Sequence, residues 1–259
     1  MPSTPTYATV WTEPFRIRAY EGGPDERASL LTVCNLFQEA AGEQARAHSL
    51  EAFPLPGGGV STWVLSRLRV EAVGPLPRAR DAVTVDTWPS SREGLRVGRD
   101  FVLRDAAGEA LVRATSVWFL FDVARRRPVR LHADMDRFLP PPDVPRGLTL
   151  EGHAVPVAPE QATRTECFAI RHADLDRVRH ANHVRVAEWV LEAVPEAVRA
   201  ARALVGLDVV FQSEATLGQA VVSACGPAGE SAGAEGALAH HVARESDGRT
   251  VALARTHWT

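Results

Sequence analysis

The sequence contains no lysine, because all 29 of its basic residues are arginine. Lysine chemistry such as Schiff-base catalysis is therefore excluded. Cysteine is scarce as well: the three residues Cys34, Cys167 and Cys225 are scattered and fit neither a disulfide framework nor a metal-binding pattern. Few unpatterned cysteines are typical of a reducing compartment, which favours a cytoplasmic location.

Long apolar segments are also missing. No apolar run is long enough to span a bilayer, and the N-terminus has neither the basic start nor the apolar stretch of a signal peptide. The formal net charge of −3 argues against nucleic acid as a partner. At 259 residues, with a hydrophobic fraction of 45%, the chain can bury a full core and hold two domains.

What the sequence does contain is the same pattern twice. Segment 15–40 aligns without a gap with segment 168–193, and segment 111–118 resembles segment 251–258. Self-similarity at a long period indicates a duplicated structural unit. The identical pairs in the first alignment are Phe15/Phe168, Ile17/Ile170, Arg18/Arg171, Ala28/Ala181, Val33/Val186, Glu39/Glu192 and Ala40/Ala193.

Each unit is expected to combine one early helix with an antiparallel sheet. In the first unit, Ser29 is the candidate N-cap, and apolar residues then recur at steps of three and four. Both helices are apolar on most sides, which predicts that each lies inside a curved sheet. The first helix is expected to begin at about residue 30, and the second to span about 182–194. The expected strands span 11–20, 62–72, 82–88, 95–105 and 110–122 in the first unit, and a segment before 174, 204–211, 220–225, 237–244 and 250–258 in the second.

A proline-rich segment separates the two units. Pro140, Pro141, Pro142 and Pro145 remove hydrogen-bond donors and stiffen the chain, so regular structure is not expected from about 139 to 160. The predicted organisation is an N-terminal domain over 1–138, a linker over 139–160 and a C-terminal domain over 161–259. Glycine, alanine and serine over 226–236 predict a mobile loop.

Only the second unit carries polar groups suited to chemistry. Asp176, His180 and Glu214 have Gly23, Arg27 and roughly Pro75 as their counterparts in the first unit. Three interpretations of the stretch 172–183 compete. Asp174, Asp176 or Asn182 could cap the following helix. Alternatively, the stretch could bind a metal ion, although the spacing of its possible ligands matches no known motif. These possible ligands are His172, Asp174, Asp176, His180 and His183.

The third interpretation is acid–base catalysis. A carboxylate four residues before a histidine, just ahead of a helix N-terminus, could share one site with the exposed N–H groups of that helix. The carboxylate and the imidazole could then orient or deprotonate a water molecule. Glu214, in the run Phe211-Gln212-Ser213-Glu214, could complete this site.

At these residues the chain resembles the acyl-carrier-protein thioesterases, namely the plant fatty-acyl type and its bacterial relatives. That family carries Asp-Leu-Asp-x-Asn-x-His-Val-Asn-Asn ahead of its second helix, followed by Trp-x-Leu-Glu. Here the second part is Trp189-Val190-Leu191-Glu192, and the first part reads Asp174-Leu175-Asp176-Arg177-Val178-Arg179-His180-Ala181-Asn182-His183. The resemblance extends over almost the whole chain and implies an α+β fold, a double (tandem) hotdog with two curved antiparallel sheets, each wrapped around a central helix.

The resemblance also implies roles for individual residues. The catalytic Asp, His and Glu of the family fall on Asp176, His180 and Glu214. Its catalytic Asn falls on Val178, and the cysteine of some members falls on Ala215. Asp176 would position or activate water, His180 would assist proton transfer and Glu214 would support the water. The oxyanion would be held at the helix end by the amides of Asn182, His183 and Val184.

The implied function is hydrolysis of acyl-carrier-protein thioesters to free fatty acid during fatty acid biosynthesis, with the acyl chain bound in the first unit. The resemblance implies no cofactor and no metal. Single-domain acyl-CoA thioesterases also have an apolar residue at the position of Val178, so an acyl-CoA thioesterase is one alternative. The others are a non-catalytic acyl-thioester binder and, more distantly, a carbon–oxygen lyase.

Basic residues crowd the motif. Acyl carrier proteins are acidic, so Arg171, Arg177, Arg179 and Arg185 predict a docking surface for the carrier, while a solvated loop explains them equally well. Assembly into a homodimer stays open, and the sequence does not give the preferred acyl-chain length.

Overall fold

The structure is a computed structural model that describes residues 9–53, 55, 59, 61–130, 136, 139–140, 144–229 and 236–259. The chain forms two compact units, and we describe each by itself. Unit 1 comprises Met1–Leu65 with Val73–Thr149, and unit 2 comprises Ser66–Ala72 with Leu150–Thr259. The exact domain bounds that the sequence suggests stay a prediction.

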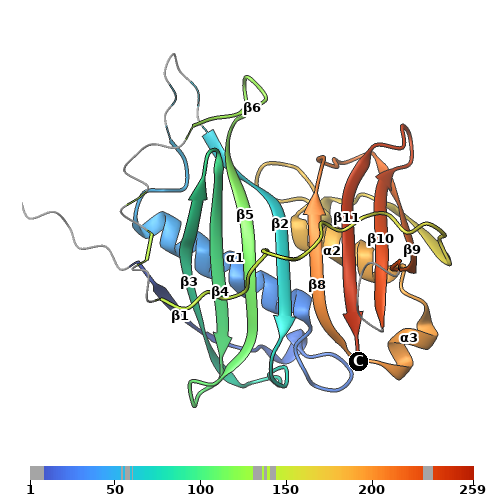
Figure 1. Ribbon diagram of the computed structural model, residues 1–259, viewed down its shortest axis with the longest axis horizontal. Helices are drawn as coiled ribbons and strands as arrows, with labels where there is room; N and C mark the ends of the chain where they lie inside the picture. Colours follow the sequence, from blue (N-terminus) through green and yellow to red (C-terminus); the bar gives the residue numbers. More distant parts are fainter. Residues whose placement is uncertain are drawn as a thin grey trace, which may run out of the picture. The chain divides into compact units, whose positions relative to one another are not determined.

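Unit 1 is one antiparallel sheet with one long helix (Figure 1). Its strands are ordered β1-β3-β4-β5, and the short β6 pairs with β5. The elements are β1 (Trp11–Arg16), η1 (Ala19–Glu21), α1 (Leu30–Ala47), β2 (Ser61–Ala72), β3 (Ala82–Glu93), β4 (Arg96–Arg104), β5 (Ala110–Asp122) and β6 (Arg127–Pro128).

Unit 2 repeats this design with its own antiparallel sheet, ordered β2-β8-β11-β10-β9-β7. Strand β2 contributes through its C-terminal part, where Arg67 to Glu71 pair with β8. The other elements are β7 (Arg164–Ala169), η3 (His172–Asp174), α2 (His183–Glu192), α3 (Glu196–Ala201), β8 (Leu204–Phe211), β9 (Ala220–Pro227), β10 (Ala237–Arg244) and β11 (Thr250–Trp258).

Each long helix is buried against the sheet of its own unit. In α1 the predicted apolar stripe is buried at Leu30, Val33, Phe37 and Ala40, and Phe37 stacks on Phe101 of β4 with 4.9 Å between ring centroids. In α2, Trp189 stacks on Phe168 of β7 with ring centroids 6.5 Å apart. The predicted central position of both helices is therefore confirmed, and burial of their apolar side chains is the main force that holds each unit together.

Several element boundaries differ from the expectation, among them the end of β3, which reaches Glu93 rather than Trp88. The first strand ends at Arg16 rather than near residue 20, since the N–H of Arg18 donates to Glu21 Oε2 at 2.7 Å and the chain turns there. The second helix ends at Glu192 rather than Val194, and a separate short helix starts at Glu196. Pro195, which has no N–H, lies between the two helices and prevents their fusion.

The linker has no regular structure within its described part, residues 139–140 and 144–160, as predicted. It is nevertheless anchored to unit 1. The buried carboxylate of Asp100 accepts hydrogen bonds from Gly147 N–H at 2.9 Å and from Arg146 Nε at 2.7 Å. A side chain at position 147 would come within 2.6 Å of Ala114 O, so only glycine fits. Pro141 and Pro142 of the predicted linker, and most of the predicted mobile loop 226–236, lie outside the described residues.

The interior of unit 2 holds a buried polar group. The imidazole Nε2 of His240 lies 2.8 Å from Thr256 Oγ1, which also accepts a hydrogen bond of 2.8 Å from Trp258 Nε1. Burial lowers the pKa of His240 from 6.5 to about 3. The imidazole is therefore neutral in the folded protein over the whole physiological pH range.

We expect this histidine to make folding sensitive to acid. The unfolded chain takes up a proton at His240 below about pH 6.5, whereas the folded chain does not. Stability is therefore fully present above that pH and falls as the pH drops towards the folded pKa. Between about pH 6.5 and pH 5 the loss should reach about 2 kcal/mol. Urea unfolding of wild type and His240→Gln at both pH values measures it, and an equal loss in both proteins would contradict the assignment.

Candidate active site

The candidate site is built on a tight turn ahead of α2. The N–H of Asp176 donates to His180 O at 2.8 Å, and the N–H of Arg179 donates to Asp176 O at 3.0 Å. Arg179 closes the turn in the left-handed region, with φ of 65°. Few non-glycine residues adopt this conformation, so the turn is tightly specified by its hydrogen bonds.

Unit 1 contains the same turn without the chemistry. The N–H of Gly23 donates to Arg27 O at 2.8 Å, the N–H of Glu26 donates to Gly23 O at 2.9 Å, and Glu26 has φ of 62°. Gly23 takes the place of Asp176 and Arg27 the place of His180. Since a glycine stands at this position, the turn does not require a carboxylate at that residue; in unit 1 the carboxylate that accepts from Arg27 N–H is that of Asp25, at 3.1 Å.

The carboxylate of Asp176 is only partly used by the turn. Its Oδ1 accepts hydrogen bonds from the N–H groups of Val178 at 2.9 Å and His180 at 3.1 Å. This oxygen therefore holds the turn and does not cap α2, whose N-cap is Asn182. The other oxygen makes no hydrogen bond to any residue in the described part of the chain, so it remains available to a water molecule.

Glu214 completes the group. Its Oε2 lies 3.2 Å from His180 Nε2, and both side chains are partly exposed, by 37% and 39% respectively. The segment after β8 is held there because Ala181 N–H donates to Ala215 O at 2.8 Å. The structure therefore brings together the three residues that the sequence predicts to be catalytic. Gln219, which sequence reasoning missed, stabilises this segment by accepting from Thr216 N–H at 3.0 Å.

The unit 1 counterpart of Glu214 shifts by one residue from the expected Pro75. There the N–H of Ala28 donates to Pro77 O at 2.8 Å, in the same way as Ala181 donates to Ala215. Leu76 therefore corresponds to Glu214. Unit 1 therefore has an apolar side chain at the position that Glu214 occupies in unit 2.

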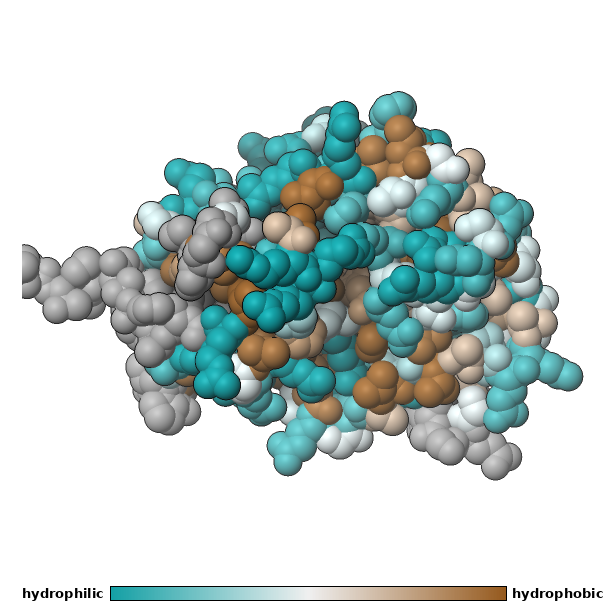
Figure 2. Space-filling model, turned by 90° about the horizontal axis from the view of Figure 1, so that it is seen from above, coloured by the Kyte–Doolittle hydropathy of each residue, from teal (hydrophilic) through white to brown (hydrophobic). Residues whose placement is uncertain are grey.

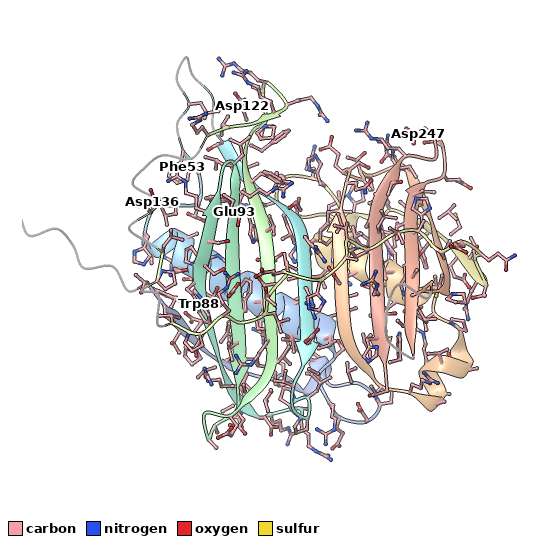
Figure 3. The ribbon with its side chains drawn as sticks, in the orientation of Figure 1. Phe53, Trp88, Glu93, Asp122, Asp136 and Asp247 are labelled. Atoms are coloured by element: carbon pink, nitrogen blue, oxygen red, sulfur yellow. The ribbon has the colours of Figure 1, made fainter. Side chains whose placement is uncertain are left out.

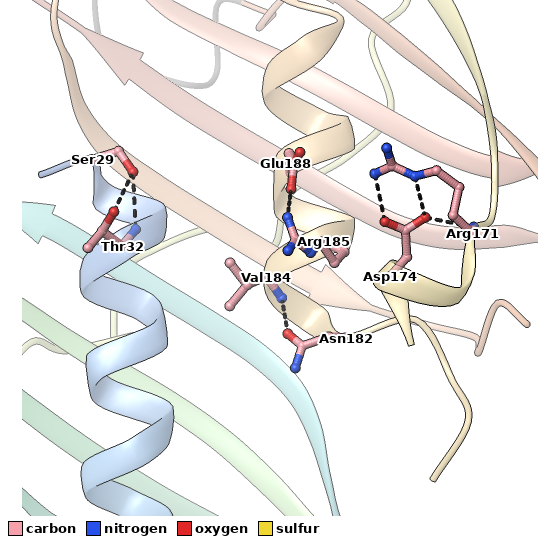
Figure 4. A network of polar contacts seen from close by, with 8 residues as sticks. All are labelled: Ser29, Thr32, Arg171, Asp174, Asn182, Val184, Arg185 and Glu188. Atoms are coloured by element: carbon pink, nitrogen blue, oxygen red, sulfur yellow. Dashed lines mark hydrogen bonds and ion pairs between the residues drawn. The ribbon is translucent and has the colours of Figure 1, made fainter. Parts of the chain in front are cut away.

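The start of α2 offers fewer free amides than expected. Asn182 is the N-cap, as predicted, and its Oδ1 accepts from Val184 N–H at 2.8 Å (Figure 4). The N–H of Asn182 itself donates to Asp174 O at 2.8 Å. Of the three predicted oxyanion donors, His183 is the one whose N–H has no hydrogen-bond partner among the described residues. It is therefore the candidate donor to a developing oxyanion.

The side chain of His183 is half-buried and packs edge-on against Phe211, with 6.1 Å between ring centroids and an interplanar angle of 87°. Burial lowers its pKa from 6.5 to about 4, so the ring is neutral near pH 7. Phe211, at the end of β8, is another contact that sequence reasoning missed, although it lies in the run that leads to Glu214.

The arginines of the motif are largely matched by carboxylates. Arg171 pairs with the buried Asp174, with Nη2 2.8 Å from Oδ1, and Arg185 pairs with Glu188 at 2.6 Å (Figure 4). The guanidinium of Arg171 holds the pKa of Asp174 below its usual value. The remaining two, Arg177 and Arg179, are exposed on the turn itself.

Metal binding finds no support in the geometry. Among the described residues, no group of three or more histidine, cysteine, aspartate or glutamate side chains is placed to hold an ion. Asp174 is already engaged by Arg171, and His172 is exposed. Within the same part of the chain, no helix combines the length and apolar character needed to cross a membrane.

Val178 lies at the tip of the turn and is 45% exposed. An asparagine introduced at this position would therefore be open to solvent.

Comparisons with known proteins agree with this geometry. Two protein-family models match the chain: the acyl-ACP thioesterase N-terminal domain over residues 8–138 and the acyl-ACP thioesterase C-terminal domain over residues 157–259. Acyl-[acyl-carrier-protein] hydrolase FATB3, chloroplastic, of Cuphea viscosissima is 29% identical over 94% of the chain and 61% of its own length. Palmitoyl-acyl carrier protein thioesterase, chloroplastic, of Cuphea hookeriana is 29% identical over 96% of the chain and 62% of its length.

The chain thus spans about three fifths of these curated relatives. Among solved structures, the 12:0-ACP thioesterase from Umbellularia californica superimposes with a TM-score of 0.83 at 26% identity, covering 98% of this chain and 95% of that one. An acyl-ACP thioesterase from Bacteroides thetaiotaomicron gives a TM-score of 0.80 at 20% identity, covering 97% and 98%. The predicted tandem hotdog fold is confirmed.

The N-cap of α2 can be tested against that of α1. We expect Asn182→Ala to lower the free energy of unfolding by about 1 kcal/mol, because Val184 N–H loses its acceptor. Asn182→Ser should retain most of the stability, since Ser29 caps α1 by accepting from Thr32 N–H at 3.1 Å. Urea unfolding of the two variants checks this. Equal stability of both variants would show that the cap contributes nothing.

Proposed function

The chain belongs to the acyl-ACP thioesterase family, and from this premise we propose that it hydrolyses acyl-carrier-protein thioesters to free fatty acid and carrier protein. One observation supports the proposal above all. Two turns with the same backbone hydrogen bonds differ in their side chains, and the turn of unit 2 carries Asp176, His180 and Glu214 where unit 1 has Gly23, Arg27 and Leu76. Groups that the fold does not require are kept for the reaction.

In the proposed mechanism, Asp176 orients a water molecule through its unused carboxylate oxygen and accepts one proton from it. The resulting hydroxide attacks the thioester carbonyl carbon, and the carbonyl oxygen becomes an oxyanion. The N–H of His183, at the positive end of the α2 dipole, stabilises that charge. The carbon–sulfur bond then breaks, the sulfur takes a proton from His180, and the carboxylic acid is released.

Glu214 orients His180 in this scheme. At 3.2 Å from Nε2, its carboxylate fixes the position of the ring that donates to the leaving sulfur. A thiol nucleophile takes no part, because Ala215 occupies the position of the family cysteine. We further propose that unit 1 binds the acyl chain, that the enzyme is cytoplasmic and that it uses no cofactor.

A second candidate function is acyl-thioester binding without hydrolysis. It is favoured by Val178, which replaces the catalytic asparagine of the family with a side chain that cannot form a hydrogen bond. Release of thiol from acyl-carrier and acyl-CoA thioesters distinguishes the two functions. A folded protein that binds the thioester but releases no thiol above buffer would establish the binder.

Asp176→Asn tests the catalytic assignment. The change is nearly isosteric and keeps Oδ1 as an acceptor for the turn, but it removes the charge that accepts a proton. We expect turnover to fall by about 100-fold or more, with an unchanged midpoint of thermal unfolding. Asp25→Asn is the matched control, since Asp25 Oδ1 accepts from Arg27 N–H at 3.1 Å in the turn of unit 1. A fully active Asp176→Asn variant would return this residue to the role of a cap.

Val178→Asn tests the departure from the family. Because the position is 45% exposed, the new amide stays solvated and stability should not change. We expect turnover to rise, since the amide adds an orienting hydrogen bond at the turn. Steady-state kinetics on one acyl-carrier substrate measures the effect, and an unchanged or lower turnover would show that the site works without this group.

A further inference from the structure

Around the turn that carries Asp176, the positive charges of the arginines are balanced by carboxylates, so this region has no surplus of positive charge to attract an acidic carrier. In addition to the pairs made by Arg171 and Arg185, two carboxylates lie in the site itself. As many carboxylates as arginines therefore occupy this region. The arginines are Arg171, Arg177, Arg179 and Arg185, and the carboxylates are Asp174, Asp176, Glu188 and Glu214.

One end of unit 1 is different. We call this end of unit 1 the basic end, because its described residues include twice as many arginines as carboxylates. The arginines are Arg92, Arg96, Arg125, Arg126, Arg127 and Arg130, and the carboxylates are Glu93, Asp122 and Asp136. In Figure 3 the labelled Glu93, Asp122 and Asp136 mark this end of the sheet.

Strand pairing brings these segments together. Glu93 pairs with Arg96 across the β3–β4 turn, and Arg96 pairs in turn with Phe119 of β5, with its guanidinium 5.9 Å from the centre of the Phe119 ring. Across the β5–β6 turn, Asp122 pairs with Arg127. The basic end is therefore one continuous surface at the end of the sheet where these turns lie.

Part of the charge remains unmatched. Arg92 pairs with Asp136 at 2.6 Å and Arg125 with Asp122 at 2.9 Å. For Arg96, Arg127 and Arg130, the described residues offer no carboxylate within ion-pair distance. Three exposed cations that have no carboxylate partner among the described residues attract an anionic surface from a distance of about one Debye length, roughly 10 Å at ordinary ionic strength.

The basic end also has the shape and the apolar groups of an interface. A cavity of about 560 Å³ opens there, and Arg92, Leu95 and Arg130 contribute to its lining. Leu95 and Val123 are 38% and 57% exposed. Figure 2 looks onto the β6 end of the molecule and shows apolar groups set among hydrophilic side chains. Arginine with exposed aliphatic side chains is typical of surfaces that bind an acidic amphipathic helix.

We propose that the basic end is the docking surface for the acidic carrier protein. The inference rests on the proposed function, because it identifies the carrier as the partner, and it adds a location that the motif does not predict. Docking here concerns the protein part of the substrate only. Its loss should therefore slow the reaction of carrier-linked thioesters and leave small thioesters unaffected.

The test is the double variant Arg127→Glu/Arg130→Glu, whose side chains have no carboxylate partner in the described part of the chain. The matched control, Arg78→Glu/Arg249→Glu, makes the same change in net charge. Arg78 precedes the opposite end of β3, and a strand of 12 residues is about 36 Å long. A third variant, Arg177→Glu/Arg179→Glu, tests the turn arginines.

We expect Arg127→Glu/Arg130→Glu to lower kcat/KM on the acyl-carrier substrate by about tenfold at low salt. Its kcat/KM on a small acyl thioester and its thermal midpoint should stay unchanged. Added salt should slow wild type on the carrier substrate much more than it slows this variant. A loss no larger than that of the control, or a salt effect carried by Arg177→Glu/Arg179→Glu alone, would overturn the proposal.

Failure of the proposed function is distinguishable from failure of the docking proposal. If the protein is not a hydrolase, wild type releases no thiol from either the carrier-linked or the small thioester. Carrier docking is measured independently by fluorescence anisotropy of a labelled acyl-carrier protein mixed with wild type and the three variants. Binding that weakens only in Arg127→Glu/Arg130→Glu would support the docking surface even without hydrolysis, and equal binding by all four proteins would refute it.

Discussion

The structure depends most on the closed turn that precedes each helix. Two backbone hydrogen bonds and one residue in the left-handed region shape it, and a side-chain cap follows directly. Because the turn fixes where the helix starts, it also fixes which apolar side chains of the helix face the sheet. In unit 2 it sets Asp176 and His180 close together and pairs with the segment that carries Glu214.

The duplication separates structure from chemistry within a single molecule. The two turns share their backbone hydrogen bonds. Ahead of each turn, an arginine N–H donates to the carboxylate three residues later, from Arg18 to Glu21 in unit 1 and from Arg171 to Asp174 in unit 2. Features present in both units belong to the fold. A group found at the turn of unit 2 alone has no such structural reason, and unit 1 shows what the turn is like without it.

The repeat made most of the fold predictable. One apolar helix followed by strand-like segments occurs twice in the same order, and few known architectures fit that pattern. The candidate site was predictable as well, because Asp176 and Glu214 are carboxylates where the first copy has Gly23 and an apolar residue. The details that failed depend on which groups are hydrogen-bonded to one another. The correspondence of Glu214 to Leu76 follows from the hydrogen bond of Ala28 N–H to Pro77 O, and the loss of free amides at Asn182 and Val184 follows from their partners. Sequence spacing reports none of these.

Charge pairing around the site has a chemical consequence. A carboxylate that must accept a proton works poorly beside unpaired arginines, because cations favour its charged form and weaken it as a base. Yet an enzyme that acts on an acidic protein needs unpaired cations to attract it. In unit 2 Asp174 matches Arg171 and Glu188 matches Arg185. Among the described residues, the arginines that outnumber the neighbouring carboxylates lie in unit 1, around the turns that join β3 to β4 and β5 to β6. Under the two proposals, separate locations let the same chain attract an acidic partner and keep an effective base.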